Sequence, residues 1–127
     1  MKIFVFGSAG QLGFEILKRL AGEPCEVVTA DIGQVDITQS EHVLSAMRRE
    51  RPDVVINCAA FTDVDRAEGE SDRAFAVNRD GTGNLATAAR ETGARFIHVS
   101  TDFVFDGHAS APITEQAATN PLSVYGA

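Results

Sequence analysis

Three glycines near the start of the chain have the types and spacing of a phosphate-binding turn. They stand in the sequence Gly7-Ser8-Ala9-Gly10-Gln11-Leu12-Gly13, between an apolar run and a helical pattern. Gly7 permits a tight turn, Gly10 lets the backbone approach phosphates, and Gly13 lets the helix lie close to the strand. The start of that helix would then face the pyrophosphate of a dinucleotide. Turn glycines without a ligand are the alternative, and the strand–turn–helix context argues against it.

Asp31 supports the same kind of ligand. It closes the second apolar run, 18 residues after Gly13, where a carboxylate can accept hydrogen bonds from the adenosine ribose hydroxyls. Its negative charge would repel a 2′-phosphate, so the sequence predicts a preference for NADH over NADPH. A solvated aspartate in a turn is the alternative. Further on, the small residues of Asn57-Cys58-Ala59-Ala60 would let the backbone run beside a cofactor, although small residues also suit a crowded turn.

Thr101 and Tyr125 carry hydroxyl groups that could act on a carbonyl. Thr101 follows the fourth predicted strand, at the carboxyl edge where α/β folds bind ligands. A hydroxyl and a phenol can together bind a carbonyl oxygen, and the phenol can deliver a proton while a nicotinamide delivers hydride to the carbon. A phenol needs a nearby cation to do this near neutral pH. That cation is normally a lysine four residues later, which would be position 129, and this chain has 127 residues.

The elements that would position these residues alternate between strand and helix. Continuous apolar runs predict buried parallel strands over residues 2–6, 26–30, 54–57 and 95–100. Apolar stripes predict helices over residues 11–21, from an N-cap at Ser40 to before Pro52, and from about 71 to 92, where Gly81 and Gly83 suggest close packing against the sheet. Such units form parallel pairs with right-handed crossovers. We therefore expect an α/β fold, a Rossmann-type doubly wound parallel sheet with four strands in the order 3-2-1-4.

Composition narrows the class of protein. The 127 residues predict one domain, and the 44% of hydrophobic residues excludes disorder. The net charge of −7 argues against a nucleic-acid partner. Cys25 and Cys58 have no metal-ligand spacing with the three histidines, so we expect two reduced thiols, no metal site and a cytoplasmic location. No apolar run reaches the roughly 20 residues of a membrane-spanning helix, so no membrane partner is expected.

With these residues in place, the chain resembles the extended short-chain dehydrogenase/reductases and, within them, the dTDP-4-dehydrorhamnose reductases. The likeness covers all 127 positions. Its specific parts are residues 6–13, 53–60 (DVVINCAA), 62–68 (TDVDRAE), 76–78 (AVN), 98–107 (HVSTDFVFDG) and 120–126 (NPLSVYG). The segment STDFVFDG is the most discriminating of them.

The resemblance implies a role for individual residues. Thr101 and Tyr125 match the family's catalytic hydroxyl and tyrosine. The matches to its cofactor-binding positions are Gly7, Gly10, Gln11, Leu12, Gly13, Asp31, Asp36, Ile37, Ala59, Ala60, Thr62 and Asn78. Asp102, Phe103 and Val104 lie where the family lines its substrate pocket, although the family more often has tyrosine at position 103.

The reaction that the resemblance implies is reduction of the 4-keto group of dTDP-4-dehydro-L-rhamnose by NADH or NADPH. Tyr125 would be the general acid and Thr101 a hydrogen-bond partner of the substrate oxygen. The expected partner is therefore a small-molecule nucleotide sugar, and homo-oligomerisation stays open. The family continues past position 127 through the lysine, more strands and a C-terminal sugar-nucleotide-binding part. We therefore expect residues 1–127 to be an incomplete NAD(P)-binding Rossmann domain, truncated after about four strands and without measurable reductase turnover alone.

Two other functions stay open at this point. A non-catalytic dinucleotide-binding module would resemble the regulatory β subunit of methionine adenosyltransferase, which shares the fold and many of the motifs. A lysine encoded at position 129 would favour the reductase, and a stop codon would favour the module. A sugar-nucleotide epimerase or dehydratase is the third interpretation, and the segment STDFVFDG argues against it.

Overall fold

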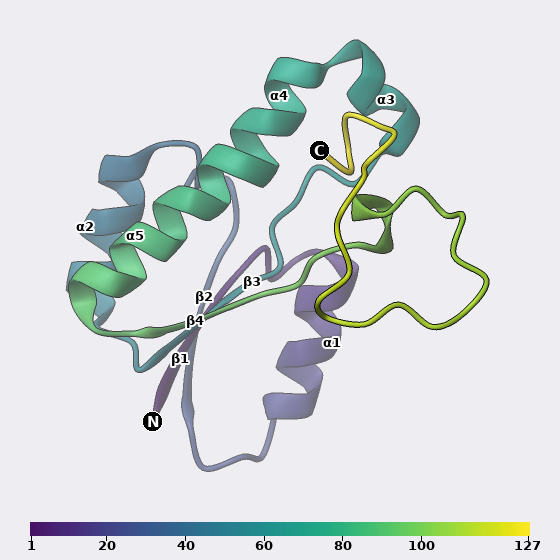
Figure 1. Cartoon of the computed structure of the whole chain (residues 1–127). Coiled ribbons are helices and arrows are strands. Elements are labelled where there is room, and N and C mark those ends of the chain that lie inside the picture. The colour runs from purple at the N-terminus through teal and green to yellow at the C-terminus, as the bar shows by residue number, and fades with distance from the viewer.

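A four-stranded parallel sheet forms the centre of the computed structural model, which describes residues 1–127. Its strands are β1 (Lys2–Phe6), β2 (Glu26–Ala30), β3 (Val54–Asn57) and β4 (Arg95–His98). The helices are α1 (Gln11–Leu20), α2 (Ser40–Glu50), α3 (Val64–Gly69), α4 (Ser71–Phe75) and α5 (Thr82–Thr92). They lie on both sides of the sheet (Figure 1), so the predicted α/β class is confirmed. None of the helices combines the length and the hydropathy needed to cross a bilayer.

The order of the strands differs from the prediction. The sheet runs β2-β1-β3-β4, whereas the sequence analysis placed Val54–Asn57 outside β2. The reason is that α1 packs on one face, through side chains such as Leu17, while α2 and α5 pack on the other. A right-handed crossover whose helix lies on the opposite face leads the chain back across β1. β3 therefore pairs with β1, with Val5 opposite Ile56.

The strand β1 lies between the two layers of the core. Phe4 and Phe6 point into the larger cluster, together with residues of α2 and α5, and Ile3 and Val5 point into a smaller cluster under α1. All four side chains are buried. Because a strand directs successive side chains to opposite faces, a continuous apolar run is the pattern of a strand that is covered on both sides. The predicted bounds of β1, β2 and β3 are confirmed, and β4 ends two residues earlier than predicted, at His98.

Residues 71–92 form one helical rod, as predicted, but its middle turn is wider than an α-helix. A π-helical segment, η1 (Ala76–Gly81), joins α4 to α5. Such wide turns are found mostly in short pieces and often near functional sites. The predicted packing of Gly81 and Gly83 against the sheet is not seen: a Cβ on Gly81 would lie 2.7 Å from Ile37 Cγ1, in the loop between β2 and α2, and Gly83 has no neighbour within 4 Å.

Two helix starts were not predicted correctly. Ser40 is the first residue of α2 rather than its cap, because Gln39 occupies the N-cap position and no side chain caps that end. The short helix α3 was not predicted at all. Its N-cap is Asp63, whose carboxylate accepts a hydrogen bond from the Arg66 amide at 3.1 Å. Six residues are too few to give a recognisable apolar stripe.

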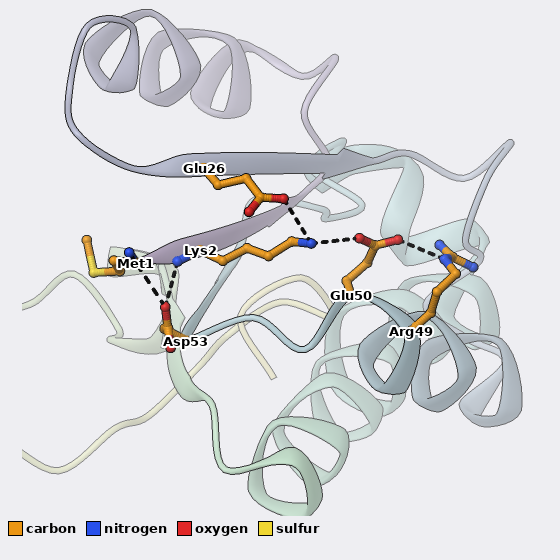
Figure 2. Close-up of polar contacts among 6 residues, drawn as sticks. All are labelled: Met1, Lys2, Glu26, Arg49, Glu50 and Asp53. Atoms are coloured by element: carbon orange, nitrogen blue, oxygen red, sulfur yellow. Dashed lines mark hydrogen bonds and ion pairs between the residues drawn. The ribbon is translucent and has the colours of Figure 1, made fainter.

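Ion pairs connect the elements at the amino edge of the sheet (Figure 2). Lys2 Nζ lies 3.0 Å from Glu26 Oε1 and 3.1 Å from Glu50 Oε2, so one ammonium links β1, β2 and the end of α2. The Lys2 amide donates a hydrogen bond of 2.6 Å to Asp53, just before β3. Hydrogen bonds to Glu26 and Glu50 raise the pKa of Lys2, and hydrogen bonds from Arg49 and Lys2 lower the pKa of Glu50. The side chains of Lys2, Glu26 and Glu50 at this edge are therefore paired with one another.

Candidate functional site

The glycine turn lies at the opposite, carboxyl edge of the sheet, between the ends of β1 and β3. Gly7 has a φ of +74°, which confirms the predicted turn, and a Cβ there would lie 2.6 Å from the Cα of Ala59. Gly13 is buried under the turn, where a Cβ would lie 2.7 Å from the Cα of Ser8. The connection from β1 leads to β2, on one side of β1, and the next strand, β3, lies on the other side of β1. Such a switch point is where open α/β sheets bind ligands.

The helix α1 begins at this turn with its first amides uncapped. Its N-cap is Gly10, which has no side chain to accept a hydrogen bond from them. The first N–H groups of a helix have no partner within the helix, and the helix dipole adds partial positive charge there. The side chains of Gln11 and Leu12 are exposed. This end of α1 can therefore receive an anion through its backbone.

Asp31 lies beside the glycine turn, at the end of β2. Its carboxylate accepts a hydrogen bond of 2.5 Å from Ser8 Oγ and one of 3.1 Å from the Ala9 amide. Its own amide donates to Gln34 Oε1 at 2.8 Å. A carboxylate has about four acceptor positions, so Asp31 retains the capacity to accept from further hydroxyl groups. This arrangement places an acidic acceptor next to the anion-binding end of α1.

An open cavity of about 310 Å³ lies at this edge. Ten of its 15 lining residues are hydrophobic, and polar groups enter it from few positions, which is the usual composition of a small-molecule site. The predicted cofactor residues that line it are Gly7, Gly10, Asp31, Asp36, Ile37, Ala59 and Ala60. Gln11, Leu12, Gly13, Thr62 and Asn78 do not line it.

The loop after β3, which forms one wall of the cavity, is held by two asparagines. Asn57 is buried, and its carboxamide accepts from the Ala59 amide at 3.0 Å and donates to Thr82 Oγ1 at 3.2 Å. Asn78, in η1, accepts from the Phe61 amide at 2.8 Å and donates to the Phe61 carbonyl at 3.0 Å. The polar atoms of Asn78 are therefore bound to the loop, and Asn78 itself lines a second cavity at this edge.

A second cavity of about 210 Å³ adjoins the first, and Ala60 lines both. Thr101 and Tyr125, the two predicted catalytic residues, both line this second cavity, although they are 24 positions apart. Thr101 Oγ1 accepts a hydrogen bond of 3.2 Å from the Phe103 amide and lies 3.3 Å from Asp102 Oδ1. The structure thus brings the hydroxyl and the phenol to one space beside the first cavity.

The three predicted substrate residues form one short 3₁₀ turn, η2 (Asp102–Val104). Val104 lines the second cavity, whereas Asp102 and Phe103 do not. The ring of Phe103 instead meets the ring of Tyr125 edge-on, with centroids 5.4 Å apart and an interplanar angle of 78°. Phe103 therefore packs against the tyrosine.

Several residues that line the two cavities were not among the predicted site residues. Ile32, Phe61 and Arg73 line the first cavity, and His98 lines the second. Ile32 directly follows Asp31, so its place beside the cavity could have been inferred from the sequence. Arg73 lies in α4, and only the packing of α4 in the folded chain brings it to the cavity. Cys58 also lines the first cavity. Burial raises the pKa of its thiol, so Cys58 acts as a small neutral wall residue near pH 7.

Comparison with known proteins shows which families share these features. The family model described as "RmlD substrate binding domain" matches residues 1–127. A dTDP-4-dehydrorhamnose reductase from Sinorhizobium fredii is 43% identical over 126 residues, which are 99% of this chain and 42% of that protein. The chain thus spans about two fifths of the length of the curated relatives it matches.

Solved structures give the same result. A crystal structure of a dTDP-4-dehydrorhamnose reductase from Clostridium acetobutylicum superposes with a TM-score of 0.97 at 48% identity, over 99% of this chain and 45% of that chain. A dTDP-4-dehydrorhamnose reductase from Bacillus anthracis, in complex with NADP, superposes with a TM-score of 0.95 at 34% identity, over 98% of this chain and 44% of that chain.

Proposed function

Because the chain belongs to the RmlD substrate binding domain family, we propose that residues 1–127 bind a nicotinamide dinucleotide at the carboxyl edge of the sheet. The reaction we propose is the NAD(P)H-dependent reduction of the 4-keto group of dTDP-4-dehydro-L-rhamnose to dTDP-L-rhamnose. The observation that carries the proposal is the juxtaposition of the Gly7 turn, the uncapped start of α1 and the Asp31 carboxylate around one open cavity.

The residues around the first cavity suit the parts of such a cofactor. The uncapped amides from Gly10 onward would hold the pyrophosphate. Asp31 would accept hydrogen bonds from the adenosine ribose, and Asp36 and Ile37 would line the adenine side. The carboxylate of Asp36 is held in place by Thr38. It accepts a hydrogen bond of 2.9 Å from the Thr38 amide and one of 2.8 Å from the Thr38 hydroxyl.

The loop after β3 would run beside the nicotinamide half of the cofactor. Ala59 and Ala60 present little side-chain bulk there, and Ala60 lines both cavities. Thr62 follows on the exposed end of this loop, and Asn78 holds the loop in place. When bound, the nicotinamide supplies the hydride for the reduction.

Thr101 and Tyr125 would act on the substrate carbonyl in the second cavity. Tyr125 would donate the proton that the carbonyl oxygen gains, and Thr101 would hold that oxygen by a hydrogen bond. Val104 lines the same cavity and would contact the sugar, with Asp102 and Phe103 beside it. In the gene product that carries this chain, Tyr125→Phe should lower kcat for NADH oxidation with the keto sugar about 100-fold or more, as expected on removal of a general acid.

Binding of the cofactor is the direct test of the proposal. Titration of this chain with NADH, followed by calorimetry and by the thermal midpoint, should give saturable binding and a rising midpoint, because a ligand that binds only the folded state stabilises it. NADPH should bind less tightly, since the Asp31 carboxylate would lie near its 2′-phosphate. No saturable binding of either dinucleotide would overturn the proposed function, and tighter binding of NADPH would overturn the preference.

A further inference from the structure

The segment that carries Tyr125 ends in a single helical turn with its own cap. The hydroxyl of Ser123 accepts a hydrogen bond of 3.2 Å from the Gly126 amide, and the Ser123 carbonyl accepts one of 3.1 Å from the Ala127 amide. This is the geometry of a serine N-cap, three residues before the amide that it satisfies. The cap leaves the Val124 amide without a partner inside the turn.

The partner of the Val124 amide comes from a distant part of the chain. Glu68 Oε1, in α3, accepts a hydrogen bond of 2.8 Å from it, across 56 positions of sequence. In Figure 1 the C-terminal segment returns alongside α3. Glu68 thus satisfies the free donor of the turn and joins it to α3.

Further contacts of the turn come from Phe103, in η2. The edge-on ring of Phe103 meets Tyr125, and a Cβ on Gly126 would lie 2.9 Å from the Phe103 carbonyl carbon. Val124, Tyr125 and Gly126 all line the second cavity. The turn is therefore fixed on one side by Phe103, which is mainly an apolar contact, and on the other by the carboxylate of Glu68.

We propose that Glu68 is a positioning residue that docks the Tyr125 turn onto α3 and thereby sets the place of the phenol in the second cavity. The inference rests on the proposed function only where it gives Tyr125 the role of proton donor. The docking itself is a property of the free protein and can be measured without cofactor or substrate.

The composition of the chain supplies a specific probe for this docking. Tyr125 is the only tyrosine and there is no tryptophan, so tyrosine emission reports on that one side chain. We would compare the wild type with Glu68→Ala, which removes the acceptor, and Glu68→Gln, which keeps an acceptor oxygen but loses the charge. Glu23→Ala is the control for the loss of one negative charge, because Glu23 lies in an exposed turn and its side chain makes no hydrogen bond or ion pair. Circular dichroism would establish that each variant is folded.

In Glu68→Ala, the ratio of docked to free turn should fall about tenfold or more, the effect of losing one charge-assisted hydrogen bond. Quenching of tyrosine emission by acrylamide should rise, and hydrogen exchange of the Val124 amide should accelerate. Glu68→Gln should restore most of both signals, and Glu23→Ala should match the wild type. Equal quenching and equal amide exchange in Glu68→Ala and the wild type would overturn the inference. A wild type that binds no NADH would instead count against the proposed function alone.

Discussion

The two edges of the parallel sheet differ in whether their polar groups are paired within the protein. At the amino edge, Lys2 pairs with Glu26 and Glu50, and Asp53 accepts from the Lys2 amide, so the charges satisfy one another (Figure 2). At the carboxyl edge, the start of α1 has no cap and opens on a cavity, with Asp31 beside it. The amino edge needs no ligand, whereas the carboxyl edge offers donors and acceptors to one.

This difference follows from the way the chain is connected. β2, β3 and β4 each follow a helix that ends at the amino edge, where residues such as Glu50 and Asp53 close the short connections. At the carboxyl edge, β1 and β3 are neighbours whose connections depart in opposite directions, and Gly7 and Ala59 both line the cavity that opens there. The same substitution should therefore weaken dinucleotide binding at the carboxyl edge, whereas at the amino edge it should lower the stability of the fold and leave binding unchanged.

The largest expected contrast compares Gly7→Ala with Gly22→Ala. Both glycines have positive φ, +74° and +93°, so each alanine costs about 1 kcal/mol of folding free energy for its backbone conformation. Only at Gly7 would the new Cβ overlap the backbone of Ala59, because Gly22 has no neighbour within 4 Å. Gly7→Ala should abolish measurable NADH binding in calorimetry, and Gly22→Ala should bind as the wild type does. Equal affinities in the two variants would show that the turn does not form the site.

A smaller contrast compares Asp31→Asn with Asp53→Asn. Removing the Asp31 charge should raise the Kd for NADH about tenfold, the effect expected for charge-assisted hydrogen bonds to the ribose, and should narrow the gap between NADH and NADPH. Asp53→Asn makes the same chemical change at the amino edge. It should lower the thermal midpoint and leave the Kd unchanged. If Asp53→Asn weakened NADH binding as much as Asp31→Asn, the assignment of the two edges would be wrong.

The smallest expected effect is a loss of thermal stability in Lys2→Met that depends on pH. The pKa of Glu50 is lowered in the folded state, so its contribution to stability is present above its ordinary value of 4.5 and is lost as the pH falls through the folded value. The pKa of Lys2 is raised, so its contribution is present below 10.5 and is lost as the pH rises through the folded value. The thermal midpoint of Lys2→Met should therefore fall below the wild type at pH 7, and the gap should narrow between pH 7 and pH 3 as Glu50 is protonated. An equal gap at both pH values would assign the loss to the packing of the lysine stem rather than its charge.

The elements with the strongest local signal are those the sequence predicts well. β1 and β3 have the predicted bounds because each is a short apolar run that both faces of the sheet bury. The end of α5 is also as expected, since Gly93 adopts a φ of +76°. The turn at Gly7 could also be predicted from local sequence, because the spacing of its glycines and the strand and helix patterns on either side identify it.

Features that depend on packing were beyond the sequence. Periodicity shows that α2 has an apolar face, but not which side of the sheet it covers, and this side decides where β3 lies. The spacing of residues 71–92 cannot separate a π turn from an α turn, so the position of Asn78 opposite Phe61 was not visible. The bond from Val124 to Glu68 joins residues 56 positions apart and has no local pattern.

The central claim is that a nicotinamide dinucleotide binds at the carboxyl edge of the sheet. Amide chemical shifts of the ¹⁵N-labelled chain, recorded during titration with NADH, test it at every residue but proline. We predict saturable shifts at residues 7–13, 31–37 and 59–61, with the amides of Lys2, Glu26, Glu50 and Asp53 unmoved. Shifts confined to those four residues, or no saturable shift at all, would contradict the account.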